Sequence, residues 1–138
     1  MRRRERTSAE LTAWLHERGY PDEDIEQAVR GLTESGALDD ERFAHGYAQD
    51  KRELRGWGRQ RIREALAGRG VAPALIDTAL GADTHEAEVE RASALLVQRD
   101  HPLGGDADRA RALGFLTRRG YDYDAAYEAV RAAARGDE

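Results

Sequence analysis

Three glycines spaced about fifty residues apart divide this sequence into similar segments, and they are Gly19, Gly70 and Gly120. Each glycine has a leucine four residues before it and an alanine nine residues after it. These residues are Leu15, Leu66 and Leu116, and Ala28, Ala79 and Ala129. Apolar residues repeat at three- and four-residue intervals on both sides of each glycine, which predicts two helices joined by a glycine-capped turn. Self-similarity at a fixed period is typical of a stacked helical array.

Start signals extend the helical pattern along the whole chain. Thr7 and Glu10 fit a capping box, in which a hydroxyl and a carboxylate satisfy free backbone donors at a helix start. Asp83 and Glu86 fit a second box. Further helix starts are expected at Pro21, where acidic residues follow, at Asp39 and at Pro73. No stretch alternates with a period of two, so we expect no strands.

These signals predict an all-α fold of three tandem three-helix repeats, spanning residues 6–55, 56–102 and 103–135. The clearest break between helices is the His-Pro-Leu-Gly-Gly segment at residues 101–105. The last repeat is truncated, because no third helix follows its second one. Hydrophobic residues make up 40% of the chain and charged residues 36%, which suits an elongated array with much surface per residue.

The composition excludes several kinds of protein. The chain has no cysteine, so disulfide scaffolds, thiolate zinc sites and thiol nucleophiles are ruled out. No apolar run approaches the length of a membrane span, and we expect a soluble, cytoplasmic protein with no membrane partner. The four histidines fall in separate expected elements, namely His16, His45, His85 and His101. We therefore expect no metal site, no cofactor, no catalytic residues and no enzymatic activity.

The Gly56-Trp57-Gly58 segment precedes an expected helix, as phosphate-binding loops do. It lacks the third glycine of a dinucleotide fingerprint and the Gly-Lys-Ser/Thr of a P-loop, and no strand precedes it. We interpret it as a flexible joint between units, with Trp57 packed.

Charge is distributed unevenly, although the net charge is only -5. Residues 22–41 carry eight carboxylates against one arginine, whereas residues 51–69 carry seven basic residues against two glutamates. This asymmetry allows an anionic partner to bind at one place on an acidic protein.

The basic segment is the best candidate for a functional surface. Arg59 and Arg63 lie four residues apart and share a helix face, and guanidinium groups suit phosphate because they donate two parallel hydrogen bonds. The candidate contact residues are Lys51, Arg52, Arg55, Arg59, Arg61, Arg63 and Arg69. A solvated, arginine-rich helix face is the alternative interpretation. For residues 22–41 the alternatives are solvated helix starts or a docking surface for a basic protein patch.

Three segments resemble the RecX family. The first is Arg6-Thr7-Ser8-Ala9-Glu10-Leu11 with Leu15 and Gly19 after it. The second runs from Leu32 to Ala44, where a short loop and paired acids precede Arg-Phe-Ala. The third is Arg55-Gly56-Trp57-Gly58-Arg59-Gln60-Arg61-Ile62, with Leu66 and Gly70-Val71 downstream. The resemblance covers residues 6 to 135 and keeps the three units in order.

Membership of that family implies a curved array of three-helix repeats and a regulator of the bacterial recombinase RecA. It implies a non-catalytic protein that lodges in the groove of the RecA–DNA filament. There it limits filament extension and the ATPase, strand-exchange and coprotease activities of RecA. The resemblance places Arg55, Arg59, Arg61 and Arg63 at the basic positions of the third segment, and these are expected to face the filament.

The main alternative is an autonomous helix-turn-helix DNA-binding regulator, since tandem three-helix units can present a helix to a groove. The negative net charge argues against it, because nucleic-acid-binding domains are usually basic overall. We expect a monomer, with single-stranded DNA bound weakly or through RecA.

Overall fold

The computed structural model describes residues 5–136, and within them the chain forms helices and no strand. The helices are α1 (Ser8–Glu17), α2 (Asp22–Glu34), α3 (Asp40–Arg55), α4 (Arg59–Gly68), α5 (Pro73–Ala79), α6 (His85–Gln98), α7 (Asp106–Arg118) and α8 (Tyr123–Gly136). This confirms the all-α prediction. None of these described helices is long and apolar enough to cross a membrane.

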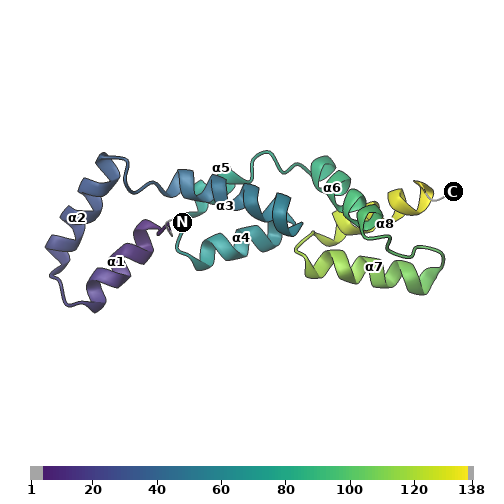
Figure 1. Cartoon of the computed structure of the whole chain (residues 1–138), viewed down its shortest axis with the longest axis horizontal. Helices are drawn as coiled ribbons and strands as arrows, with labels where there is room; N and C mark the ends of the chain where they lie inside the picture. Colours follow the sequence, from purple (N-terminus) through teal and green to yellow (C-terminus); the bar gives the residue numbers. More distant parts are fainter. Residues whose placement is uncertain (1–4, 137–138) are drawn as a thin grey trace.

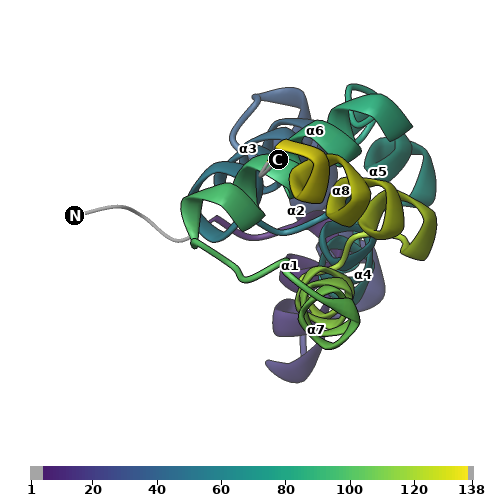
Figure 2. The ribbon, with the colours of Figure 1, turned by 90° about the vertical axis from the view of Figure 1, so that its right-hand side faces the viewer.

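The helices form an elongated array with the α1–α2 hairpin at one end and α6, α7 and α8 at the other (Figure 1). The glycines of the repeat lie in the turns α1–α2, α4–α5 and α7–α8. Each has positive φ: +86° at Gly19, +83° at Gly70 and +99° at Gly120. Two views place α1, α4 and α7, the first helix of each hairpin, along one edge of the array (Figures 1 and 2).

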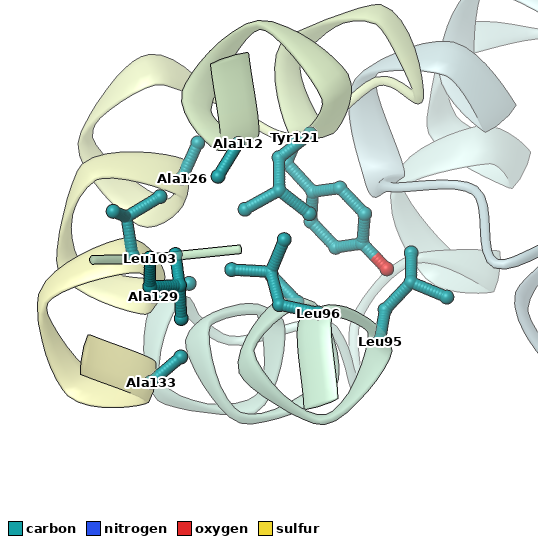
Figure 3. Packing of buried hydrophobic residues seen from close by; sticks show 11 residues of the cluster. Leu95, Leu96, Leu103, Ala112, Tyr121, Ala126, Ala129 and Ala133 are labelled. Carbon is teal, nitrogen blue, oxygen red and sulfur yellow. The ribbon is translucent and has the colours of Figure 1, made fainter. Parts of the chain in front are cut away.

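Two buried clusters hold most of the array together. The first joins α3, α4 and α5 through residues such as Phe43, Ile62 and Ile76. The second joins α6, α7 and α8 and includes Leu116 of α7. Leu96 of α6 and Ala112 of α7 lie in it with an alanine-rich face of α8 (Figure 3). The small α8 side chains let α6 approach closely, so this cluster is tightly packed.

The packed bundles are offset by one helix from the repeats expected at 6–55, 56–102 and 103–135. α3 packs on α5 and α6 packs on α8, so each third helix joins the hairpin that follows it in the chain. The two-helix unit among the described residues is therefore α1–α2, and the C-terminal bundle has three helices. The sequence marks the turns but not which hairpin a connecting helix covers.

Most expected helix starts agree with the structure. Thr7 accepts a hydrogen bond from the backbone of Glu10, whose side chain accepts one from Thr7, so the first capping box is confirmed. The second predicted capping box, at Asp83 and Glu86, is wrong. Thr84, not Asp83, caps α6, by accepting from the backbone of Ala87 at 3.1 Å. Asp83 is instead buried in a network of ion pairs.

Candidate interaction surface

Two similar joints link consecutive hairpins. At the first joint, the start of α1 lies on the Gly70 turn. The Thr7 hydroxyl donates to the backbone carbonyl of Arg69 at 2.7 Å, and the Ser8 backbone N–H donates to Asp40 at 2.8 Å. Thr7 is fully buried as a result.

At the second joint, the start of α4 lies on the Gly120 turn in the same manner. Gly58 N–H donates to the carbonyl of Arg119 at 2.8 Å, and Gln60 N–H donates to that of Gly120 at 3.1 Å. The Arg59 N–H donates to the buried carboxylate of Glu88 at 2.8 Å. Gly58 is buried and hydrogen-bonded here, so the expected flexible joint at Gly56-Trp57-Gly58 is a packed one.

Three of the seven candidate basic residues have their guanidinium groups committed to internal contacts: Arg59 and Arg69 at these joints, and Arg52 between α3 and the end of α5. Arg52 pairs with buried Asp83 at 2.8 Å and donates to the carbonyl of Ala79. Arg59 pairs with Asp122 at 2.8 Å, which raises the pKa of its guanidinium through that hydrogen bond.

Arg69 binds both carboxylate oxygens of Glu10, at 2.8 and 2.9 Å, and lies over the ring of Phe43. The hydrogen bonds to Glu10 raise the pKa of this guanidinium as well. The structure thus gives Arg52, Arg59 and Arg69 a structural role that the sequence analysis did not foresee. Arg63 makes an exposed pair with Asp77 at 2.9 Å.

Two of the remaining candidates, Lys51 and Arg61, lie over one indole ring. The Lys51 ammonium lies 4.8 Å and the Arg61 guanidinium 4.2 Å from the centre of the Trp57 ring. Arg55 is exposed and precedes Trp57 by two residues, and its backbone carbonyl accepts a hydrogen bond from Arg119 at 2.8 Å.

Arg119 extends this surface onto the next bundle. Its guanidinium lies 4.9 Å from the Phe115 ring, with Arg99 5.8 Å from the same ring. We call these residues the basic–aromatic patch: Lys51, Arg55, Trp57, Arg61, Arg99, Phe115 and Arg119. The sequence analysis selected neither Arg99 nor Arg119. Residues 109–119 carry four arginines and no carboxylate, a signal that could have found Arg119, whereas Arg99 is followed directly by Asp100.

The cations of the patch form no ion pairs in the part of the chain that the structure describes. Within residues 5–136, no ion pair joins Lys51, Arg55, Arg61, Arg99 or Arg119 to a carboxylate. Burial lowers the pKa of Arg119, and the positive charges of Arg99 and Arg61 lower it further. Like charges held close together with no counter-charge favour an anionic partner.

The acidic segment divides into two parts. Asp39 caps α3 and Asp40 binds the start of α1, so these two acids serve helix starts, as expected. The acids of α2 lie on an exposed helix. Among the described residues, no group of three or more histidine or carboxylate side chains is placed to hold a metal ion.

Comparisons with known proteins identify the family and support the fold. The family model for RecX, described as its second three-helix domain, matches residues 39–80, which form α3, α4 and α5. A Regulatory protein RecX from Mycolicibacterium vanbaalenii is 37% identical, over 94% of this chain and 75% of the relative. One from Halorhodospira halophila is also 37% identical, over 99% of this chain and 84% of the relative.

The chain belongs to the RecX family. The crystal structure of RecX from Lactobacillus salivarius superimposes with a TM-score of 0.82 at 18% identity, covering 94% of this chain and 86% of that one, which supports the shared fold. A second crystal structure, of regulatory protein RecX, gives 0.74 at 25% identity over 94% of this chain and 64% of that one. The RecX model match to residues 39–80 coincides with one packed bundle, which supports the structural grouping of the helices. As a RecX family member, the chain is a regulatory protein, as its relatives are named.

Proposed function

We propose that this protein inhibits RecA by lodging in the groove of the RecA–DNA filament without catalysing a reaction. In this proposal it limits filament extension and with it the ATPase, strand-exchange and coprotease activities of RecA. The basic–aromatic patch is the contact surface. The observation that carries this choice is the gathering of cations at the Trp57 and Phe115 rings, none of which forms an ion pair with a carboxylate within residues 5–136.

The chemistry of the patch supports contact with phosphate or with carboxylate groups of a filament. Arginine donates in parallel to both kinds of group, and a flat aromatic ring holds the guanidinium plane in place. Lys51, Arg55 and Arg61 are the candidates that carry this contact. Arg63 lies on the same helix as Arg61 and adds charge at its edge. Arg59 and Arg69 act by fixing the joints, and Arg52 by holding α3 on the end of α5.

DNA contact on this proposal is weak without RecA, because the chain as a whole is acidic. The protein acts as a monomer in the cytoplasm, where RecA filaments assemble.

The direct test is titration of the protein into RecA assembled on single-stranded DNA with ATP. We expect ATP turnover and filament length to fall at stoichiometric amounts. If neither quantity changes, the proposal is wrong. Tight binding to duplex DNA with sequence preference and no effect on RecA would favour the autonomous DNA-binding alternative.

A double charge reversal tests the surface itself. Lys51→Glu with Arg61→Glu should raise the concentration needed for half-inhibition at least about tenfold, since each lost charged hydrogen bond is worth about 1.5–3 kcal/mol. The matched control is Arg131→Glu, because Arg131 is an exposed arginine of α8 outside the patch. Equal inhibition by the double variant and the control would contradict the choice of surface.

A further inference from the structure

The two joints carry opposite charges at one equivalent position. Thr7 and Gly58 hold the same place in their hairpins, since each directly precedes its helix and lies twelve residues before the glycine of the hairpin turn. Three residues further along the chain, α1 carries Glu10 and α4 carries Arg61. A guanidinium at the second joint therefore stands where the first joint has a carboxylate.

At the first joint, the carboxylate of Glu10 forms a salt bridge with the arginine of the turn. This arginine, Arg69, directly precedes Gly70 and donates through Nε and Nη2 to the two carboxylate oxygens, at 2.8 and 2.9 Å. These hydrogen bonds raise the pKa of the Arg69 guanidinium. The first joint thus supplies the anion that its turn arginine binds.

The equivalent arginine of the second joint, Arg119, has a different environment. Its Nη1 donates to a backbone carbonyl at the end of α3. Within residues 5–136, no hydrogen bond or ion pair uses its Nε or Nη2, the edge with which Arg69 binds its carboxylate. Burial lowers the pKa of Arg119, and the positive charges of Arg99 and Arg61 lower it further, whereas the pKa of Arg69 is raised.

Arg61 is held close to this open edge by the packing of the joint. A methyl group on Gly120 would lie 2.2 Å from the Cβ of Arg61, so the Arg61 side chain begins directly beside the turn. Its Nη1 donates to the carbonyl of Arg118 at 3.4 Å, and its guanidinium lies 4.2 Å from the centre of the Trp57 ring. Two guanidinium groups kept together in this way attract a group of negative charge.

We propose that Arg61 and Arg119 together bind a carboxylate side chain from an acidic segment of a partner protein, which acts as Glu10 does at the first joint. A carboxylate is planar and offers two oxygens, which match the paired donors on one edge of a guanidinium. Its negative charge offsets the repulsion between the two arginines, so binding also stabilises the joint. The site lies within the basic–aromatic patch, and the place of this partner in RecA inhibition rests on the proposed function.

Thermal unfolding of the free protein tests the arginine pair without any partner. Arg61→Glu should unfold about 2–4 °C higher than Arg61→Gln, because both lose the contact with Trp57 and only glutamate supplies a carboxylate to Arg119. The same comparison in an Arg119→Gln background should give a smaller difference. An equal difference in both backgrounds would overturn the proposal, since a carboxylate near a helix start is stabilising by itself. A midpoint for Arg61→Glu at or below that of Arg61→Gln would overturn it as well.

A labelled oligoglutamate peptide tests binding directly. Its affinity for the full chain, measured by fluorescence anisotropy at low salt, should fall at least about tenfold in Arg61→Glu and in Arg119→Gln. The affinity should be retained in Arg131→Glu, which changes the net charge as much as Arg61→Glu does and lies outside the patch. Absence of saturable binding, or equal affinity for all variants, would overturn the proposal.

An oligothymidylate of the same charge decides between a protein and a nucleic acid as the partner. We expect it to bind more weakly than the oligoglutamate peptide. Tighter binding that is lost in Arg61→Glu and Arg119→Gln would assign the site to phosphate groups and overturn the carboxylate assignment. None of these measurements contains RecA, so their failure is distinct from failure of the proposed inhibition.

Discussion

The two joints of the array have the same geometry but different chemistry. In both, the start of a helix lies on the turn of the next hairpin. The first backbone N–H of that helix donates a hydrogen bond to a carboxylate at 2.8 Å, to Asp40 at the first joint and to Glu88 at the second. The first joint uses the hydroxyl of Thr7 to reach the Arg69 carbonyl. The second uses the backbone N–H of Gly58 to reach the Arg119 carbonyl.

This difference decides how closely the backbone of the helix start approaches the backbone of the turn. A methyl group on Gly58 would lie 2.6 Å from backbone atoms of Gly120 and Tyr121, so the second joint is backbone against backbone. At the first joint such a group on Gly70 would lie 2.4 Å from the Cβ of Ala9, but the nearest backbone atom, the Cα of Ala9, is 3.8 Å away. The joint beside the basic–aromatic patch is therefore the less tolerant of change, and it fixes how the two halves of the patch meet.

The largest effect is expected from Gly120→Ala. The new methyl group would meet the backbone N of Arg61 at 2.7 Å, at a φ of +99° that L-residues avoid. Overpacking and left-handed strain together should cost about 3–5 kcal/mol in the free energy of unfolding. Gly19→Ala is the matched control, because nothing lies within 4 Å there and only the strain of about 1–2 kcal/mol applies. Chemical denaturation measures both, and equal losses would show that the second joint is not close-packed.

Gly58→Ala should cost less, about 2–3 kcal/mol, because φ at Gly58 is -81° and only overpacking applies. We expect it to weaken RecA inhibition as well, since it separates Arg61 from Arg119. Inhibition is compared at a temperature where circular dichroism shows the variant folded. A stability within 0.5 kcal/mol of wild type, which is the usual scatter for surface changes, would contradict the backbone contact.

Thr7→Ala removes the capping box and the hydrogen bond to the Arg69 carbonyl at the first joint. A loss of about 1–2 kcal/mol is expected from the cap. Amide hydrogen exchange should accelerate in α1 more than in α4, because the change acts on the first joint. Thr7→Ser keeps the hydroxyl and should retain most of the protection. Uniform acceleration across the array would show that the joints are not independent.

The smallest effect is a pH dependence at the second joint. Burial raises the pKa of Glu88 above its ordinary value of 4.5, so the folded state holds this proton more tightly than the unfolded state. Stability contributed by protonated Glu88 is present at low pH and is lost as pH rises through the raised pKa. Relative to Glu88→Gln, wild type should gain stability as pH falls from 7 towards 5, measured by denaturation at several pH values. The opposite slope would show that ion pairing with Arg91 outweighs burial.

Local sequence signals predicted the elements well and their pairing poorly. The box at Thr7, the start at Pro73 and the turn glycines were confirmed, because caps and left-handed turns depend on neighbouring residues alone. The box at Asp83 was wrong because a distant partner, Arg52, binds its carboxylate.

The candidate surface was predictable only in part. An excess of arginine in residues 51–69 marks the region, but not which guanidinium groups are free. Arg59 and Arg61 are two residues apart and have different partners, Asp122 and the Trp57 ring. The partner Asp122 is 63 residues away in the chain, so no local pattern reveals it.

The sequence by itself determined the helices, their turns, the repeat and the family, because each depends on residue order. Tertiary structure alone decided which hairpin each third helix covers, which arginines are neutralised and that Gly58 and Gly120 meet. Those outcomes depend on how closely distant segments approach. At the second joint the absence of side chains at Gly58 and Gly120 sets the distance between the start of α4 and the α7–α8 turn.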